Sequence, residues 1–180
     1  MRVGKRIVRR IGQQALTFRF PAVIEGQVSY IGPDEFLGRW FFLSFVPTLE
    51  RSDNVLWNRQ GKELAKLGAA LLLVPSERQT SIRRRSLVPE HMHFLVAEDP
   101  LSRLQRLYGG SMTQSVGRGR TFLVDPSGSL RFHLVHSLTD QGMKVLVEVL
   151  IAYQKMDARS RCKPHGHSAL ESSFSSRALL

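Results

Sequence analysis

The chain contains one thiol, Cys162, which is the residue with the clearest capacity for covalent chemistry. Its neighbours Arg159, Arg161 and Lys163 are cationic, and nearby positive charge lowers the pKa of a thiol and makes it more nucleophilic. Two uses are open, a mixed disulfide with another protein or a second copy, and redox sensing. A single cysteine in a polar tail more often has no redox role.

The same tail holds a small group of soft and borderline metal ligands, Cys162, His165 and His167. A closed zinc site takes four ligands from elements that fix their geometry, whereas these three follow one another in a serine-rich segment. We therefore expect no bound metal. The sequence also contains no Walker loop, no dinucleotide-binding glycine pattern and no nucleophile elbow, so we expect no cofactor.

Two basic segments are candidates for binding an anion, residues 1–10 and the run Arg83, Arg84 and Arg85. The formal net charge of +11 favours acidic partners such as nucleic acid or an anionic surface. Consecutive arginines can contact phosphates, but no aromatic side chains alternate with them to stack bases. A solvated surface run is the simpler interpretation, and anion binding is kept as an alternative.

An apolar, aromatic run at residues 40–45 is the segment around which the other elements are organised, and it predicts a strand buried on both faces. Pro47 ends this strand because it has no N–H to donate. A polar cap then begins a helix over residues 55–67, and residues 69–74 predict a second buried strand. A strand, helix and strand of this length predict a right-handed crossover between parallel strands.

The other patterns predict an N-terminal hairpin, a helix capped by Asp99, a C-terminal hairpin and a closing helix that begins at Thr139 or Asp140. Their ranges are residues 16–20 and 27–31 for the first hairpin, 120–125 and 129–135 for the second, and a last helix that runs through Tyr153. Asp125, in the turn of the second hairpin, is expected to bond its own backbone. Beyond Lys155 the sequence has no apolar periodicity, so we expect no packing there. The order predicts an α/β fold, a thioredoxin-like mixed sheet with helices on both faces. We expect a basic head at 1–15, one domain at 16–155, and a basic, serine-rich tail at 156–180.

Several segments, taken in order, resemble the peroxiredoxin family of the alkyl-hydroperoxide-reductase and thiol-specific-antioxidant type. The likeness spans roughly residues 16–164. The segment 37–47 is similar to the one that precedes the family's active-site loop, and 64–74 looks like the helix and strand after it. The other resembling segments are 93–100 with 107–109, the hairpin 120–128, and Tyr153 followed by 162–164. The resemblance implies a peroxiredoxin-type thioredoxin fold.

The resemblance also identifies the positions of the peroxide site. Counted from Pro47, the family's peroxidatic cysteine falls on Asn54, and Ser52 supplies at most a displaced hydroxyl. The family's arginine falls on Gly119, and Arg120 is an adjacent candidate. An amide is not a nucleophile toward peroxide, and a serine hydroxyl is weakly reactive without an adjacent base. The usual thiol peroxidase mechanism is therefore closed at this site.

The resemblance then implies a peroxiredoxin-like protein without standard peroxidase activity, which acts as a binding or subunit-association module. Its expected partners are a second copy, as in a dimer, or a related peroxiredoxin. The alternative is a thiol-dependent antioxidant oxidoreductase or redox sensor that uses Cys162, at a resolving-type position, with a thiol reductant. The chain is an enzyme under the second of these hypotheses and not under the first, and the sequence leaves both open.

The remaining expectation concerns the compartment. No apolar run reaches the ~18 residues that a membrane span needs, and no continuous apolar segment follows the basic N-terminus as in a secretory signal. A single cysteine excludes an internal disulfide framework. We therefore expect a cytoplasmic protein.

Overall fold

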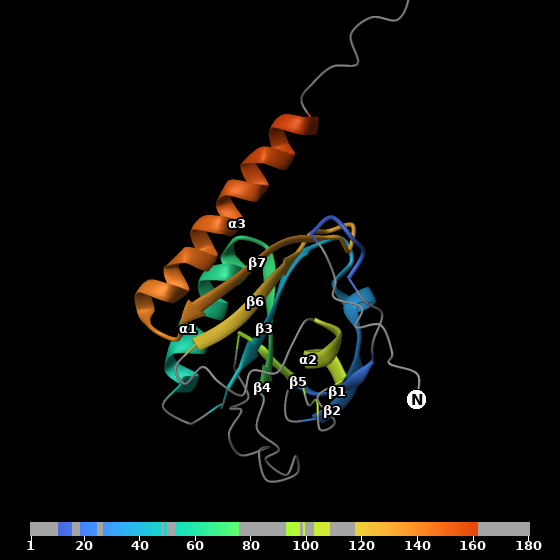
Figure 1. Cartoon of the computed structure of the whole chain (residues 1–180), viewed down its shortest axis with the longest axis vertical. Helices are drawn as coiled ribbons and strands as arrows, with labels where there is room; N and C mark the ends of the chain where they lie inside the picture. The colour runs from blue at the N-terminus through green and yellow to red at the C-terminus, as the bar shows by residue number, and fades with distance from the viewer. Residues whose placement is uncertain are drawn as a thin grey trace, which may run out of the picture.

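The computed structural model describes residues 11–15, 19–24, 27–47, 49, 53–75, 93–97, 99, 103–108 and 118–161. The predictions for residues 1–10, for Ser52, for Arg83, Arg84 and Arg85, and for Cys162 lie outside these residues. The described strands form one sheet in the order β2-β1-β5-β4-β3-β6-β7 (Figure 1). The strands are β1 (Phe20–Ile24), β2 (Gln27–Ile31), β3 (Trp40–Val46), β4 (Ala69–Pro75), β5 (Leu95–Ala97), β6 (Arg118–Val124) and β7 (Leu130–Ser137). The helices are α1 (Asp53–Lys66), α2 (Arg103–Leu107), α3 (Asp140–Arg161) and a 3-10 turn, η1 (Pro33–Phe36).

The central strand β3 is buried along its whole length, as the aromatic run predicted. It pairs in parallel with β4 and antiparallel with β6, so both of its edges are hydrogen-bonded. Side chains alternate along a strand, and this alternation sends Phe41 and Phe45 into one core and Phe42 and Val46 into the other. The predicted connection of two parallel strands through a helix, β3–α1–β4, is confirmed.

Helices cover both faces of the sheet, which confirms the predicted fold class. Trp57 and Leu64 of α1 pack with Leu146 of α3 in the core on one face. Leu104 of α2 lies in the core on the other face, with Tyr108 directly after the helix. Figure 1 shows α1 and α3 together on one side of the sheet and α2 on the other. No helix in the described ranges is long and apolar enough to cross a membrane.

The first hairpin is displaced from its predicted position. The first strand was predicted at residues 16–20, but β1 runs from Phe20 to Ile24 and contains Pro21. Pro21 lies opposite Tyr30 of β2, whereas β5 pairs only with Ala22 and Val23 on the other side. A proline is tolerated in a strand where no neighbour requires its N–H, so the short β5 permits it here.

The last helix is longer than its pattern predicted. We expected it to run through Tyr153 and expected no packing beyond Lys155, but α3 continues to Arg161. The extension is held by polar contacts, because the Gln154 side chain donates to the Leu67 carbonyl at 2.7 Å and Asp157 contacts Arg131 at 3.5 Å. Polar anchors leave no apolar periodicity in the sequence, which is why the prediction ended too early.

Candidate functional site

The candidate site lies where β3 ends and α1 begins. Val46, the last residue of β3, is in register with Pro75, the last residue of β4, and Pro47 follows directly. Two adjacent parallel strands therefore end together, each at or next to a proline. In open α/β sheets the crevice beyond the carboxyl ends of the strands is where ligands bind.

Asn54, which the resemblance places at the position of the family's reactive cysteine, occupies the first turn of α1 and is buried, with 6% of its surface exposed. The N-terminus of a helix stabilises negative charge through its free N–H groups and its dipole. A thiolate at this position would gain that stabilisation, whereas the amide of Asn54 carries no charge. The environment suits an anion, but the residue present cannot become one.

Arg120 lies beside the last residues of β3, at the end of the sheet where α1 begins. In the sheet it is opposite Phe45 on one side and Val135 on the other. Burial lowers the pKa of the nearby His133, and the positive charge of Arg120 lowers it further. The His133 ring also stacks on Phe122, with ring centroids 4.6 Å apart. Arg120 and Asn54 both make polar or ring interactions, so neither is a free side chain.

Gly119 occupies the position where the resemblance places the family's arginine, and two side chains of β7 and the segment after it crowd the space beside its Cα atom. A Cβ atom on Gly119 would lie 2.9 Å from Leu138 Cδ2 and 3.3 Å from His136 Cε1. His136 is itself buried, with 6% of its surface exposed. A histidine ring from β7 thus fills the space that a longer residue at position 119 would need.

His136 belongs to a row of buried polar side chains that crosses three strands, which we call the polar chain: Ser44 of β3, Thr121 of β6 and His136 of β7. The Ser44 and Thr121 hydroxyl oxygens are 2.6 Å apart, and Thr121 Oγ1 is 2.7 Å from His136 Nε2. His136 Nδ1 is 3.1 Å from the carbonyl oxygen of Ser137. Burial lowers the pKa of His136, while the bond to Ser137 acts in the opposite direction.

The polar chain is not apparent from the sequence. In the sequence His136 is an isolated histidine, and such histidines are mostly structural or solvent-facing. The available signal was Ser44, a hydroxyl in the middle of an otherwise apolar strand that is buried on both faces. A buried hydroxyl needs a hydrogen-bond partner, but the partners are distant in sequence and only the strand order identifies them.

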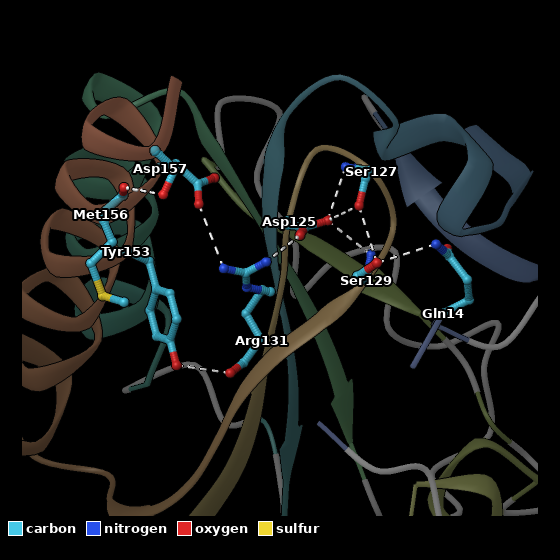
Figure 2. Close-up of polar contacts among 9 residues, drawn as sticks. Gln14, Asp125, Ser127, Ser129, Arg131, Tyr153, Met156 and Asp157 are labelled. Carbon is cyan, nitrogen blue, oxygen red and sulfur yellow. Dashed lines mark hydrogen bonds and ion pairs between the residues drawn. The ribbon is translucent and has the colours of Figure 1, made fainter. Parts of the chain in front are cut away.

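A second polar group lies at the opposite end of the β6–β7 hairpin. Asp125 Oδ1 accepts hydrogen bonds from the backbone N–H groups of Ser127 and Ser129, both at 2.9 Å, and from the Ser127 hydroxyl at 2.6 Å. This confirms the prediction that Asp125 bonds its own turn. Arg131 lies 3.3 Å from Asp125 Oδ2 and reaches Asp157 of α3 (Figure 2).

Arg131 is available for these contacts because of a β-bulge. Val124 is in register with Leu130 and Leu123 with Phe132, so Arg131 has no opposite residue on β6. A bulge re-aims the extra side chain. The Tyr153 hydroxyl donates to the Arg131 carbonyl at 2.8 Å, and the Arg131 guanidinium lies over the Tyr153 ring (Figure 2). The group joins the hairpin turn to α3 and is structural. Within the described ranges no group of three His, Cys, Asp or Glu residues could hold a metal ion.

Comparison with known proteins supports the same fold. No protein-family model matches the chain. The chain is 21% identical over 170 residues to peroxiredoxin TSA1 of Saccharomyces cerevisiae, covering 88% of this chain and 87% of that protein. It is 24% identical over 156 residues to peroxiredoxin TSA1-B of Candida albicans, covering 80% of each.

Solved structures show the likeness over most of the chain. The crystal structure of Enterococcus faecalis AhpC superposes with a TM-score of 0.66 at 16% identity, covering 83% of this chain and 95% of that one. The mitochondrial 2-Cys peroxiredoxin of Plasmodium falciparum superposes with a TM-score of 0.66 at 13% identity, covering 86% of this chain and 100% of that one. At these identities the structural match establishes the fold.

Proposed function

We propose that this chain, a divergent member of the peroxiredoxin family, is not a standard thiol peroxidase and acts as a binding or subunit-association module. One observation carries the proposal: the first turn of α1, where the family resemblance places the reactive thiol, holds the buried amide of Asn54. Peroxide reduction begins with attack of a thiolate on a peroxide oxygen, which gives a sulfenic acid and releases an alcohol or water. An amide cannot make that attack.

The alternative is a thiol-dependent oxidoreductase or redox sensor that uses Cys162, because this is the only thiol in the sequence. Cys162 lies outside the described residues, so its sequence neighbours are its only support. Arg161 and Lys163 on either side favour the thiolate. Such a role would require a thiol reductant to return Cys162 to the reduced state.

A hydroperoxide-consumption assay separates the two functions. With hydrogen peroxide or cumene hydroperoxide and a dithiol reductant, we expect the purified protein to consume no more peroxide than the buffer. We expect Cys162→Ser to behave identically, with a yeast peroxiredoxin as the positive control. Turnover in the wild type that disappears in Cys162→Ser would overturn the proposal and favour the Cys162 oxidoreductase.

The association role is supported by the edge of the sheet. Among the described strands β7 is the last in the order, with β6 on one side. Residues 12–15 bond to residues 128–130, with Gly12 N donating to the Leu130 carbonyl at 2.7 Å, and so protect only the beginning of β7. Val135, farther along β7, is 44% exposed. An uncovered strand edge is a template for pairing with another chain, so we propose a second copy or a related peroxiredoxin as the partner.

Val135→Lys is expected to weaken this association. A lysine on an edge strand opposes edge-to-edge pairing, because its charge must be desolvated in the interface. Val55→Lys on α1 is the matched control, because Val55 is also exposed, at 75%. We expect light scattering over a concentration series to give a dimer for the wild type and Val55→Lys, and a shift toward monomer for Val135→Lys. A monomeric wild type, or equal dissociation of both variants, would contradict the edge interface.

Cytoplasmic localisation belongs to the same proposal. Binding of nucleic acid or an anionic surface through Arg83, Arg84 and Arg85 stays a prediction, because these residues lie outside the described ones. Phosphate contacts lose affinity steeply as salt rises, so the salt dependence of binding would identify that activity.

A further inference from the structure

The polar chain Ser44–Thr121–His136 contains more donors than acceptors once the histidine is protonated. With a neutral ring, Nδ1–H donates to the Ser137 carbonyl, Nε2 accepts from the Thr121 hydroxyl, and Thr121 accepts from the Ser44 hydroxyl. Each hydrogen then has an acceptor. With a protonated ring, Nε2–H must donate to Thr121, and the Thr121 hydrogen can no longer point at Nε2. One hydroxyl hydrogen, of Thr121 or of Ser44, then has no acceptor within the polar chain.

The protonated form is therefore disfavoured twice. Protonation forces the Thr121 hydroxyl to turn away from Nε2, and it places a charge where Ser44 is 0% and Thr121 1% exposed. A buried charge without a partner is expensive, and a hydroxyl hydrogen without an acceptor adds the cost of a lost hydrogen bond. The geometry of the polar chain therefore favours the neutral imidazole of His136.

No described carboxylate is placed to offset the charge. On β6, Arg118 and Arg120 alternate with Gly119 and Thr121, so they belong to the opposite face of the strand. On α3 the first-turn acid is Asp140, which is exposed and pairs with Arg59 of α1. The shift in the pKa of His136 accordingly has burial as its largest cause and no neighbouring charge among its causes.

The polar chain is connected to the beginning of α3 through Ser137. The Ser137 hydroxyl is 3.0 Å from Thr139 Oγ1, which accepts from the Gly142 N–H at 3.3 Å and so caps the helix. A Cβ atom on Gly142 would overlap the Ser137 carbonyl, the same carbonyl that His136 Nδ1 contacts. Because the helix packs this closely on Ser137, movement of the His136–Ser137 unit requires movement of α3.

We propose that the polar chain is a proton-sensitive latch, which holds the end of β7 and the beginning of α3 on the central strand while His136 is neutral and releases them when it is protonated. The device goes beyond the proposed binding role and does not depend on it. The latch lies at the β7–α3 junction, which is at the same end of the sheet as the candidate site. Acidification would therefore change the structure at that end.

The direction of the pH effect follows from proton linkage. The pKa of His136 is lowered from 6.5 in the folded protein, so the unfolded chain binds the proton more readily. The neutral His136 ring stabilises the fold fully above the pKa that it has in the unfolded chain. This stabilisation is lost as the pH falls from that value through the lower pKa of the folded protein. Between the unfolded-state pKa and the folded-state pKa of His136, the folding equilibrium constant falls about tenfold for each unit by which the pH is lowered.

The test is an NMR titration of the full chain from about pH 8 to about pH 5, in the range where histidine titrates. It follows the His136 ring and the backbone amides of Ser137, Thr139 and Gly142 together. We expect the ring to titrate below 6.5 and the three amides to shift with the same midpoint. Amides of Leu72 and Leu73 in β4 serve as the internal control, because β4 lies between β3 and β5.

Two substitutions at Thr121 provide the matched pair. Thr121→Val removes the hydroxyl at nearly constant volume, so the neutral ring loses a donor to Nε2 and the protonated ring loses the acceptor of its Nε2–H. The bond from the charged ring is the stronger of the two, so we expect the midpoint to fall further, by about half to one pH unit. Thr121→Ser keeps the hydroxyl and should retain the wild-type midpoint. His136→Gln assigns the ring signal and should remove one proton from the pH dependence of unfolding, whereas His133→Gln should leave the latch intact.

Three results would overturn the latch. The first is a His136 midpoint at its ordinary value. The second is titration of His136 without a matching shift of the Ser137, Thr139 and Gly142 amides. The third is an equal midpoint in Thr121→Val and Thr121→Ser. If Thr121→Val does not fold, the wild-type titration and Thr121→Ser still decide between these outcomes.

Discussion

Asp125→Ala is expected to lower the free energy of unfolding by about 3 kcal/mol, because a buried carboxylate with several charge-assisted hydrogen bonds is lost. Asp125 is 5% exposed and accepts from two backbone N–H groups, one hydroxyl and Arg131. The substitution leaves the turn donors unpaired and frees Arg131, which also contacts Asp157 of α3. Chemical denaturation by urea measures the loss directly.

Two matched variants show whether the Asp125 network is responsible. Asp125→Asn keeps an acceptor oxygen in the turn and removes the charge, so we expect an intermediate loss. Asp34→Ala removes a carboxylate whose ion pair with Arg19 is exposed, and such pairs contribute little. Equal effects of Asp125→Ala and Asp34→Ala would show that the turn network does not stabilise the fold.

Gly61→Ala is expected to destabilise the protein although it improves the helix. Alanine is favoured over glycine inside a helix by about 1 kcal/mol. In the structure, however, a Cβ atom on Gly61 would overlap the backbone carbonyl of His93 and lie close to the His93 Cβ. Forcing an extra methyl group into a close-packed contact lowers stability by up to about 3 kcal/mol. After subtraction of the gain in helix propensity, we expect the free energy of unfolding to fall by about 2 kcal/mol.

The contact at Gly61 is held by a neighbouring hydrogen bond, because the His93 N–H donates to Asn58 Oδ1 at 2.9 Å. The segment therefore cannot move away without breaking that bond. Ala65→Gly is the control on the exposed side of α1, where only helix propensity acts and a loss of about 1 kcal/mol is expected. Thermal unfolding of both variants shows whether each substitution raises or lowers the stability. A Gly61→Ala protein more stable than the wild type would show that helix propensity outweighs the close contact.

Elements whose hydrogen bonds or burial are local were predicted well. The apolar run of β3 and the crossover to β4 follow from composition and from prolines at the strand ends. Asp99 was predicted to cap a helix, and it accepts from the Arg103 N–H at 2.7 Å and the Gln105 N–H at 3.1 Å. The turn role of Asp125 was predicted for the same reason, since its partners lie within a few residues in the chain.

Features that depend on distant partners were missed. The extension of α3 is anchored by Leu67 and Arg131, neither of which is visible in the periodicity of the helix. The bulge that places Arg131 depends on the register between β6 and β7. In the sequence Gly61 is only a residue that weakens a helix, because the approach of His93 is a tertiary contact.

The sequence by itself determined the mixed sheet and its helices on both faces, because strand burial and turn chemistry are local properties. Only the tertiary structure decided that Ser44, Thr121 and His136 form one chain, because strand order places them side by side although 77 residues separate Ser44 from Thr121. A hydrogen bond over that separation has no signature in composition or spacing. It exists because the sheet brings three buried polar groups together where each must find a partner.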